Sequence, residues 1–240
     1  MNKDEIFFDR WWAKHWIAEE SFRVNLMVSM AGGNKAARVI DLGCGNGVFL
    51  KKLKEMGFYN LYGVDYSQTA VKNLSKEGFN VIKLDLSKNF SGKLSQKFDL
   101  VLVGELLEHL PEPKKFILET KKIIKKGGRL IISTPNKDWW PNYFFKQYYR
   151  KGLSLSSAFG HSTHISFFSL KELKSLIENS NFRIIKVKGI GAETRLYNPS
   201  FSLQTLRAFI YNGVLVFSNL LSCILAKQFS SVIIILAEKK

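Results

Sequence analysis

Three closely spaced glycines mark the part of the chain best suited to bind a ligand. Gly43, Gly45 and Gly47 follow a short apolar run that includes Asp41, and a helical pattern over residues 48–56 continues from them. Because glycine has no Cβ, such a turn lets a ligand lie close to bare backbone. The spacing is not Gly-x-Gly-x-x-Gly and no Gly-Lys-Ser/Thr occurs, which argues against a dinucleotide or a nucleotide phosphate. The Asp41 carboxylate suits a cationic ligand instead.

Two further aspartates come directly after predicted strands. Asp65 follows residues 60–64, about 20 residues beyond the glycine turn, and Asp85 follows residues 80–84. Ligands of open α/β sheets bind along the carboxyl ends of the strands, so three acids at such positions indicate one ligand site. Each of the two could instead be a helix N-cap, because serines lie close to both.

A group of carboxylates and imidazoles follows the next predicted strand, residues 98–103. Glu105, Glu108 and His109 lie there, at the same edge as the aspartates, and His164 comes from a later loop. Histidine titrates near neutrality, so His109 is the first candidate for a general base and His164 the second, with Glu105 as a neighbouring carboxylate. In the alternative interpretation, His109 only packs at the start of the following helix.

The glycine turn and the segments that follow it resemble the class I S-adenosylmethionine-dependent methyltransferases. The resemblance is carried by Val-Ile-Asp-Leu-Gly-Cys-Gly-Asn-Gly at 39–47, Gly-Glu-Leu-Leu-Glu-His-Leu-Pro-Glu-Pro at 104–113 and Leu-Ile-Ile-Ser-Thr-Pro-Asn at 130–136. It implies that S-adenosylmethionine binds to Asp41, Gly43, Cys44, Gly45, Asn46, Asp65, Tyr66, Asp85, Leu86, Gly104 and Glu105. In this family the residue at Asp65 takes the ribose hydroxyls, and the pair at Asp85 faces the adenine.

The phrase Glu-x-x-Glu-His is also similar to a motif of two more specific groups. It resembles the metal-binding pattern of the small-RNA 2′-O-methyltransferases, and the ubiquinone-biosynthesis O-methyltransferases share a similar phrase. The resemblance implies a divalent metal ion held by Glu105, Glu108, His109 and His164, which would polarise a hydroxyl acceptor. The chain departs from the RNA enzymes after His164 and contains no recognisable RNA-binding domain.

Apolar periodicity supplies the elements that must position these residues. Helices are predicted at 113–125 and 169–179, and further strands at 129–133, 182–187 and 231–237. We therefore expect an α/β fold with a Rossmann-like, doubly wound and mostly parallel sheet. The resemblance implies seven strands, with the last one inserted antiparallel between the fifth and the sixth.

The whole chain is expected to form a single methyltransferase domain, 1–240. Its predicted parts are N-terminal cap helices at 1–37, a cofactor-binding core at 38–136, a substrate lid at 137–168 and a C-terminal part of the sheet at 169–240, which includes an apolar helix at 206–226. Aromatic residues are dense near the N-terminus and in the predicted lid. Such segments suit a membrane interface or stacked nucleobases equally well.

The charge balance narrows the class of partner. The chain has 36 Lys and Arg against 20 Asp and Glu, a net charge of +16, which attracts anionic lipid, nucleic acid or phosphorylated compounds. A solvated basic surface is the alternative. Two cysteines without zinc-ligand spacing and early charges that interrupt any signal peptide predict a cytoplasmic protein, with peripheral contact at the inner face of the membrane as an option.

These observations predict S-adenosylmethionine-dependent methyl transfer to an oxygen of a small-molecule or lipid-linked acceptor at a membrane surface. RNA 2′-O-methylation with a Glu-x-x-Glu-His metal site is the rival substrate class. A non-catalytic scaffold that binds the cofactor is the third possibility.

Overall fold

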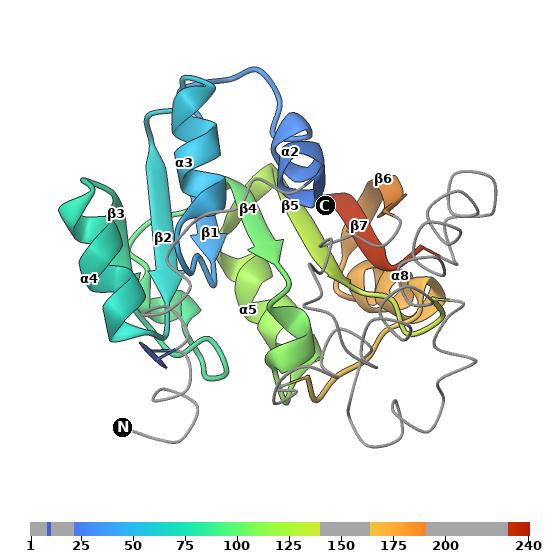
Figure 1. Ribbon diagram of the computed structural model, residues 1–240. Helices are drawn as coiled ribbons and strands as arrows, with labels where there is room; N and C mark the ends of the chain where they lie inside the picture. The colour runs from blue at the N-terminus through green and yellow to red at the C-terminus, as the bar shows by residue number, and fades with distance from the viewer. Residues whose placement is uncertain (1–8, 11–21, 140–163, 191–229) are drawn as a thin grey trace, which may run out of the picture.

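The computed structural model describes residues 9–10, 22–139, 164–190 and 230–240, and its centre is a twisted seven-stranded sheet (Figure 1). The strand order is β3-β2-β1-β4-β5-β7-β6. The strands are β1 (Val39–Leu42), β2 (Leu61–Asp65), β3 (Asn80–Lys83), β4 (Phe98–Gly104), β5 (Ile124–Pro135), β6 (Phe182–Ile190) and β7 (Val232–Lys239). This is the Rossmann-like α/β fold with seven strands that was expected.

The pairing of the strands confirms the predicted direction of the last one. Strand β1 lies parallel to β2 and β4, and β4 lies parallel to β5. Strand β7 is antiparallel to both β5 and β6 and lies between them. The parallel strands β1 and β4 are almost wholly buried, as expected of central strands covered on both faces.

Helices cover both faces of the sheet (Figure 1). The helices are α2 (Phe22–Ser29), α3 (Val48–Glu55), α4 (Gln68–Lys76), α5 (Pro113–Ile123) and α8 (Leu170–Asn179), with 3-10 turns η1 (Ser91–Lys93) and η2 (Leu107–His109). One buried cluster contains the apolar sides of α2, α3 and α4, and a second contains those of α5 and α8. The carboxyl ends of the parallel strands therefore open between two layers of helices.

Helix α5 ends earlier than the sequence predicted. The prediction ran to Lys125, whereas the helix stops at Ile123. Ile124 is extended because it pairs with Phe98, so β5 begins there and Gly127, with φ 71°, lies within that strand. The ammonium of Lys239 donates to the carbonyl oxygens of Lys121 (2.8 Å) and Ile124 (2.7 Å), which satisfies backbone acceptors at the helix end.

Several predicted segments fall wholly or partly outside the described residues. These are most of the cap at 1–37, the middle of the lid at 137–168 and the apolar helix at 206–226. Among the helices that the structure does describe, none has both the length and the apolar content needed to cross a bilayer.

Candidate functional site

The glycine turn leaves β1 and enters α3 through three residues with positive φ. Gly43, Gly45 and Gly47 have φ of 78°, 50° and 75°, a region that favours glycine. A Cβ on Gly47 would lie 2.4 Å from the Leu74 side chain. The backbone N–H of Gly43 donates to the Val64 carbonyl oxygen at 2.8 Å, which ties the turn to β2. The turn therefore brings largely buried backbone to the carboxyl edge of the sheet, which is where the sequence predicted it.

Asp41 is buried beneath this turn. Its side chain is 1% exposed, and neither carboxylate oxygen has a hydrogen-bond partner among the described residues. Burial, and secondly the negative charge of Asp65, raise the pKa of Asp41 to about 8, while the positive charge of Arg23 acts in the opposite direction. A buried carboxylate without hydrogen-bond donors gains most from a cationic ligand.

Arg23 is a site residue that the sequence analysis missed. It comes from the first turn of α2, and its Nε lies 3.5 Å from Oε1 of Glu105. The guanidinium lies 5.7 Å from the centre of the Phe49 ring, and Nη1 lies 3.3 Å from where a Cβ on Gly104 would be. The available signal was an arginine within the otherwise mostly apolar sequence Phe-Arg-Val-Asn-Leu-Met-Val-Ser. Arg23 supplies a cation suited to a ligand carboxylate, close to the acids.

Asp65 ends β2 and is held by backbone donors. Its Oδ2 accepts from the N–H of Gly45 at 2.7 Å, and its Oδ1 accepts from the N–H of Ser67 at 2.8 Å. Burial raises the pKa of Asp65, and these backbone hydrogen bonds oppose the increase. A carboxylate in this position keeps lone pairs for further donors such as ribose hydroxyls. Its neighbour in the predicted site, Tyr66, is half-buried.

Asp85 has local partners that the sequence analysis had considered as its alternative. Its Oδ1 accepts from the N–H (3.0 Å) and the hydroxyl (2.6 Å) of Ser87, and Lys88 lies 3.1 Å from Oδ2. Burial opposes the effect of these contacts, but together they lower the pKa of Asp85. Leu86 is buried beside it. Contact of this pair with an adenine remains a prediction.

Cys44 and Asn46 lie within the glycine turn and are both buried. Burial, followed by the charges of Asp65 and Asp41, raises the pKa of the Cys44 thiol well above its ordinary value. Cys44 is therefore a small packing residue of the turn, because an activated nucleophile would need a lowered pKa. Gly63 faces its sulfur, and a Cβ on Gly63 would lie 2.9 Å from Sγ.

The end of β4 has an unusual backbone at two predicted site residues. A Cβ on Gly104 would lie 2.4 Å from the Phe49 ring, so only glycine fits there without a shift. Glu105 has φ 51°, a left-handed conformation that is uncommon for a residue with a side chain, and its N–H donates to the Ser133 carbonyl oxygen at 3.1 Å. Such backbone conformations concentrate at functional sites.

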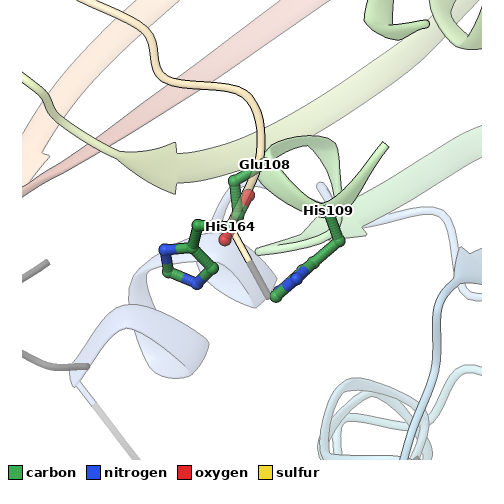
Figure 2. Close-up of side chains that lie close together, drawn as sticks. All are labelled: Glu108, His109 and His164. Atoms are coloured by element: carbon green, nitrogen blue, oxygen red, sulfur yellow. The ribbon is translucent and has the colours of Figure 1, made fainter. Parts of the chain in front are cut away.

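Glu108, His109 and His164 form one cluster at the same edge (Figure 2). One ligand atom from each lies within 4.8 Å of the others, and the centres of the two imidazole rings are 4.8 Å apart. Figure 2 shows the Glu108 carboxylate pointing toward the space between the two rings. The structure therefore brings together residues that the chain separates by more than fifty positions.

Glu108 is the buried member of this cluster. Its side chain is 2% exposed, and Oε2 accepts from the Thr134 hydroxyl at 3.0 Å. Oε1 is buried and has no hydrogen-bond partner among the described residues. Burial, and secondly the charge of Glu105, raise the pKa of Glu108 to about 8. Thr134 on β5 is a second residue that sequence reasoning did not identify.

Backbone hydrogen bonds hold the segment that carries His164 against η2. The N–H groups of Ile165 and Ser166 both donate to the Glu108 carbonyl oxygen, at 2.8 and 3.0 Å, and the Ser166 hydroxyl donates to the Leu110 carbonyl oxygen at 2.8 Å. Burial lowers the pKa of His164, so its imidazole is neutral at neutral pH and can accept a proton or a metal ion.

The predicted four-residue metal set is only partly assembled. Glu108, His109 and His164 lie together, but Glu105 is outside that cluster and pairs with Arg23. The chemistry of the three fits a divalent cation, because a carboxylate and two imidazoles are common ligands and Oε1 of Glu108 is buried without a donor. The same three groups could instead move a proton from an acceptor hydroxyl.

Comparison with known proteins identifies the family of the chain. Residues 18–187, more than half of the chain, match the family model of the methyltransferase domain. The mitochondrial ubiquinone biosynthesis O-methyltransferase of Dictyostelium discoideum is 28% identical over 180 residues, which cover 67% of this chain and 53% of that protein. The chain thus matches about half the length of that relative.

A bacterial relative and a solved structure extend the comparison. The ubiquinone biosynthesis O-methyltransferase of Coxiella burnetii is 28% identical over 165 residues, which cover 65% of this chain and 68% of that protein. A crystal structure of a SAM dependent methyltransferase from Archaeoglobus fulgidus has a TM-score of 0.63 at 22% identity, covering 99% of this chain and 100% of that one. The structural likeness concerns the fold alone.

Proposed function

The chain belongs to the methyltransferase domain family, as a class I S-adenosylmethionine-dependent methyltransferase, and from this premise we propose that it methylates an oxygen of a small-molecule or lipid-linked acceptor. The observation that carries the proposal is the cluster of Glu108, His109 and His164 beside the cofactor edge of the sheet. Oxygen is the acceptor atom that most needs such groups, because a hydroxyl must lose its proton when it is methylated.

The cofactor is proposed to lie along the carboxyl ends of β1, β2 and β4. S-adenosylmethionine supplies an electrophilic methyl group, and the protein has to bind and orient it. Asp41 is suited to the cationic part of the cofactor and Arg23 to its carboxylate, while Asp65 is suited to the ribose hydroxyls. Glu105 is linked to both parts of the site, because it pairs with Arg23 and its charge acts on Glu108.

The acceptor is proposed to enter over Glu108, His109 and His164. These residues would hold a divalent cation, if one is used, and such an ion lowers the pKa of a bound hydroxyl. His164, the second candidate from the sequence after His109, is proposed to take up the hydroxyl proton, because burial keeps its imidazole neutral. Oxygen acceptors are also named for both sequence relatives. The net charge of +16 further supports an anionic membrane surface as the place where a lipid-linked acceptor is met.

Transfer of a radiolabelled methyl group tests the proposal directly. Wild-type protein would be incubated with labelled S-adenosylmethionine and one of three acceptors: a water-soluble catechol, a catechol with a polyprenyl tail in liposomes, or an RNA with a free 2′-hydroxyl. Label in either catechol supports the proposal, and label confined to RNA would move the function to the rival substrate class. Binding of the cofactor without transfer to any of them would favour a non-catalytic scaffold.

Variants of the cluster connect transfer to these side chains. Glu108→Gln and His164→Asn are expected to lower kcat at least a hundredfold, the usual contribution of a general acid or base. Glu112→Ala is the matched control, because Glu112 is an exposed glutamate four residues away whose contact with Lys115 is 3.5 Å long. Equal activity of the cluster variants and the control would refute the assignment.

Metal use is tested separately from activity. Titration of chelator-treated protein with Mn²⁺, followed by calorimetry, is expected to give one site that Glu108→Gln removes. Full methyl transfer after chelation, together with no Mn²⁺ binding, would leave the cluster as a proton-transfer group only.

A further inference from the structure

A carboxylate from the start of the chain contacts the turn that follows β2. Oδ1 of Asp9 accepts hydrogen bonds from the Ser67 hydroxyl and, at 3.0 Å, from the backbone N–H of Thr69. These partners are 58 and 60 positions away along the chain. The contact lies at the first turn of α4, directly after the ribose candidate Asp65.

Ser67 connects this contact to the cofactor site. It is fully buried, its N–H donates to Oδ1 of Asp65 at 2.8 Å, and its Oγ accepts from the N–H of Ala70 at 3.1 Å as the N-cap of α4. Asp65 in turn accepts from the Gly45 N–H at 2.7 Å. A continuous series of hydrogen bonds therefore runs from Asp9 through Ser67 and Asp65 to the glycine turn.

We infer that Asp9 is a positioning residue for cofactor binding, which acts through Ser67 on the Asp65 carboxylate; the inference rests on the proposed function. A serine hydroxyl has a single proton and can rotate to several acceptors. With Asp9 in place, that proton is directed away from Asp65, and the carboxylate of Asp65 stays available to the ribose hydroxyls. Without Asp9, the Ser67 hydroxyl is free to turn toward Asp65 and compete for the same lone pairs.

Charge supports a specific role for a carboxylate at this position. Asp9 lies close enough to Asp65 to contribute to the raised pKa of that acid, although burial is the larger cause. Burial acts to raise the pKa of Asp9, but the hydrogen bonds from Ser67 and Thr69, together with the positive charge of Lys83, lower it overall. A second acid next to the Asp65 carboxylate costs electrostatic energy, and the hydrogen bonds that Asp9 accepts from Ser67 and Thr69 offset this cost.

The experiment compares Asp9→Ala, Asp9→Asn and Glu112→Ala in the whole 240-residue chain. Asp9→Ala is expected to raise KM for S-adenosylmethionine and Kd for S-adenosylhomocysteine about tenfold, as for one charge-assisted hydrogen bond, with kcat at saturating cofactor unchanged. Asp9→Asn should recover most of the affinity, because its amide oxygen still accepts from Ser67 and Thr69. Glu112→Ala should bind like wild type.

Two results distinguish failure of this inference from failure of the proposed function. The role of Asp9 alone would be overturned if wild type binds S-adenosylhomocysteine tightly, Asp65→Ala abolishes this binding and Asp9→Ala leaves it unchanged. No binding of S-adenosylhomocysteine to wild type would overturn the proposed function. The double variant Asp9→Ala/Ser67→Ala should bind S-adenosylhomocysteine as tightly as Ser67→Ala alone, because the hydroxyl that would compete for Asp65 is absent from both. A further loss of affinity in the double variant would also refute the inference.

Discussion

Binding of the cofactor should release a proton from Asp41. The pKa of this buried carboxyl is about 8 because of burial and the nearby Asp65, so it is mostly protonated at neutral pH. The cofactor carries an ammonium and a sulfonium, and a cation beside the carboxyl favours its ionised form. Binding and ionisation are therefore coupled, and the perturbation that reveals the coupling is a change of pH.

The size of the effect follows from the raised pKa. At pH 7 a group with a pKa of about 8 is roughly nine-tenths protonated, so binding should release up to ~0.9 proton. The apparent affinity should rise by up to about tenfold per pH unit as the pH increases from 6 to 8, and it should level off above 8.

The stability of the free protein should change with pH in the opposite direction. The native state holds a proton that the unfolded chain releases above pH ~4, so the free energy of unfolding should fall between pH 4 and 8.

Calorimetry measures the proton release directly. Titration with S-adenosylhomocysteine, which keeps the ammonium, is repeated at pH 7 in buffers of different ionisation enthalpy, and the slope of the observed heat gives the number of protons. Asp41→Asn should abolish the release and flatten the affinity between pH 6 and 8. Glu108→Gln is the control, because Glu108 has a similarly raised pKa but belongs to the proposed acceptor side. Identical heats in all buffers, or release that persists in Asp41→Asn, would refute the reasoning.

Three further predictions concern residues that support the site. Glu119→Gln should destabilise the protein by about 2 kcal/mol in thermal melts at pH 7, because the Glu119 carboxylate accepts from the N–H groups of Phe90 and Ser91 at the start of η1. The pKa of Glu119 is about 2, so the difference in stability from wild type should shrink below pH ~4. Gly104→Ala should raise Kd for S-adenosylhomocysteine and lower Tm, because the new methyl group would meet Phe49 at 2.4 Å; wild-type values for both would contradict this. Arg129→Met should raise KM for the cofactor several-fold in steady-state assays, because Arg129 donates at 2.6 Å to the carbonyl oxygen of Ala31, just beyond the end of α2, and that helix carries Arg23. An unchanged KM would show that α2 needs no such anchor.

The parts of the fold that depend on local pattern were predictable from the sequence. The glycine turn, the apolar strands and the amphipathic helices each specify their own conformation within a few residues. Asp41 and Asp65 were placed correctly at the sheet edge for the same reason, because a strand followed by a turn leaves its last side chains there. The resemblance then supplied the position of β7, which periodicity by itself does not determine.

The details of the site depended on contacts between distant segments. No local sequence pattern predicts that Arg23 pairs with Glu105 or that Thr134 donates to Glu108. Glu105 therefore pairs with Arg23 and does not join the predicted four-residue metal set. Helix α5 was predicted too long because the pairing of Ile124 with Phe98 outweighs the helical pattern.

The sequence by itself thus determined which elements form and which edge of the sheet carries the acids, since both follow from short-range periodicity and from the direction of parallel strands. Only the tertiary structure decided the partners and the ionisation of the buried groups. The physical reason is that the pKa of Asp41 or Glu108 depends on burial and on charges contributed by other segments, and neither is encoded within the few residues around them.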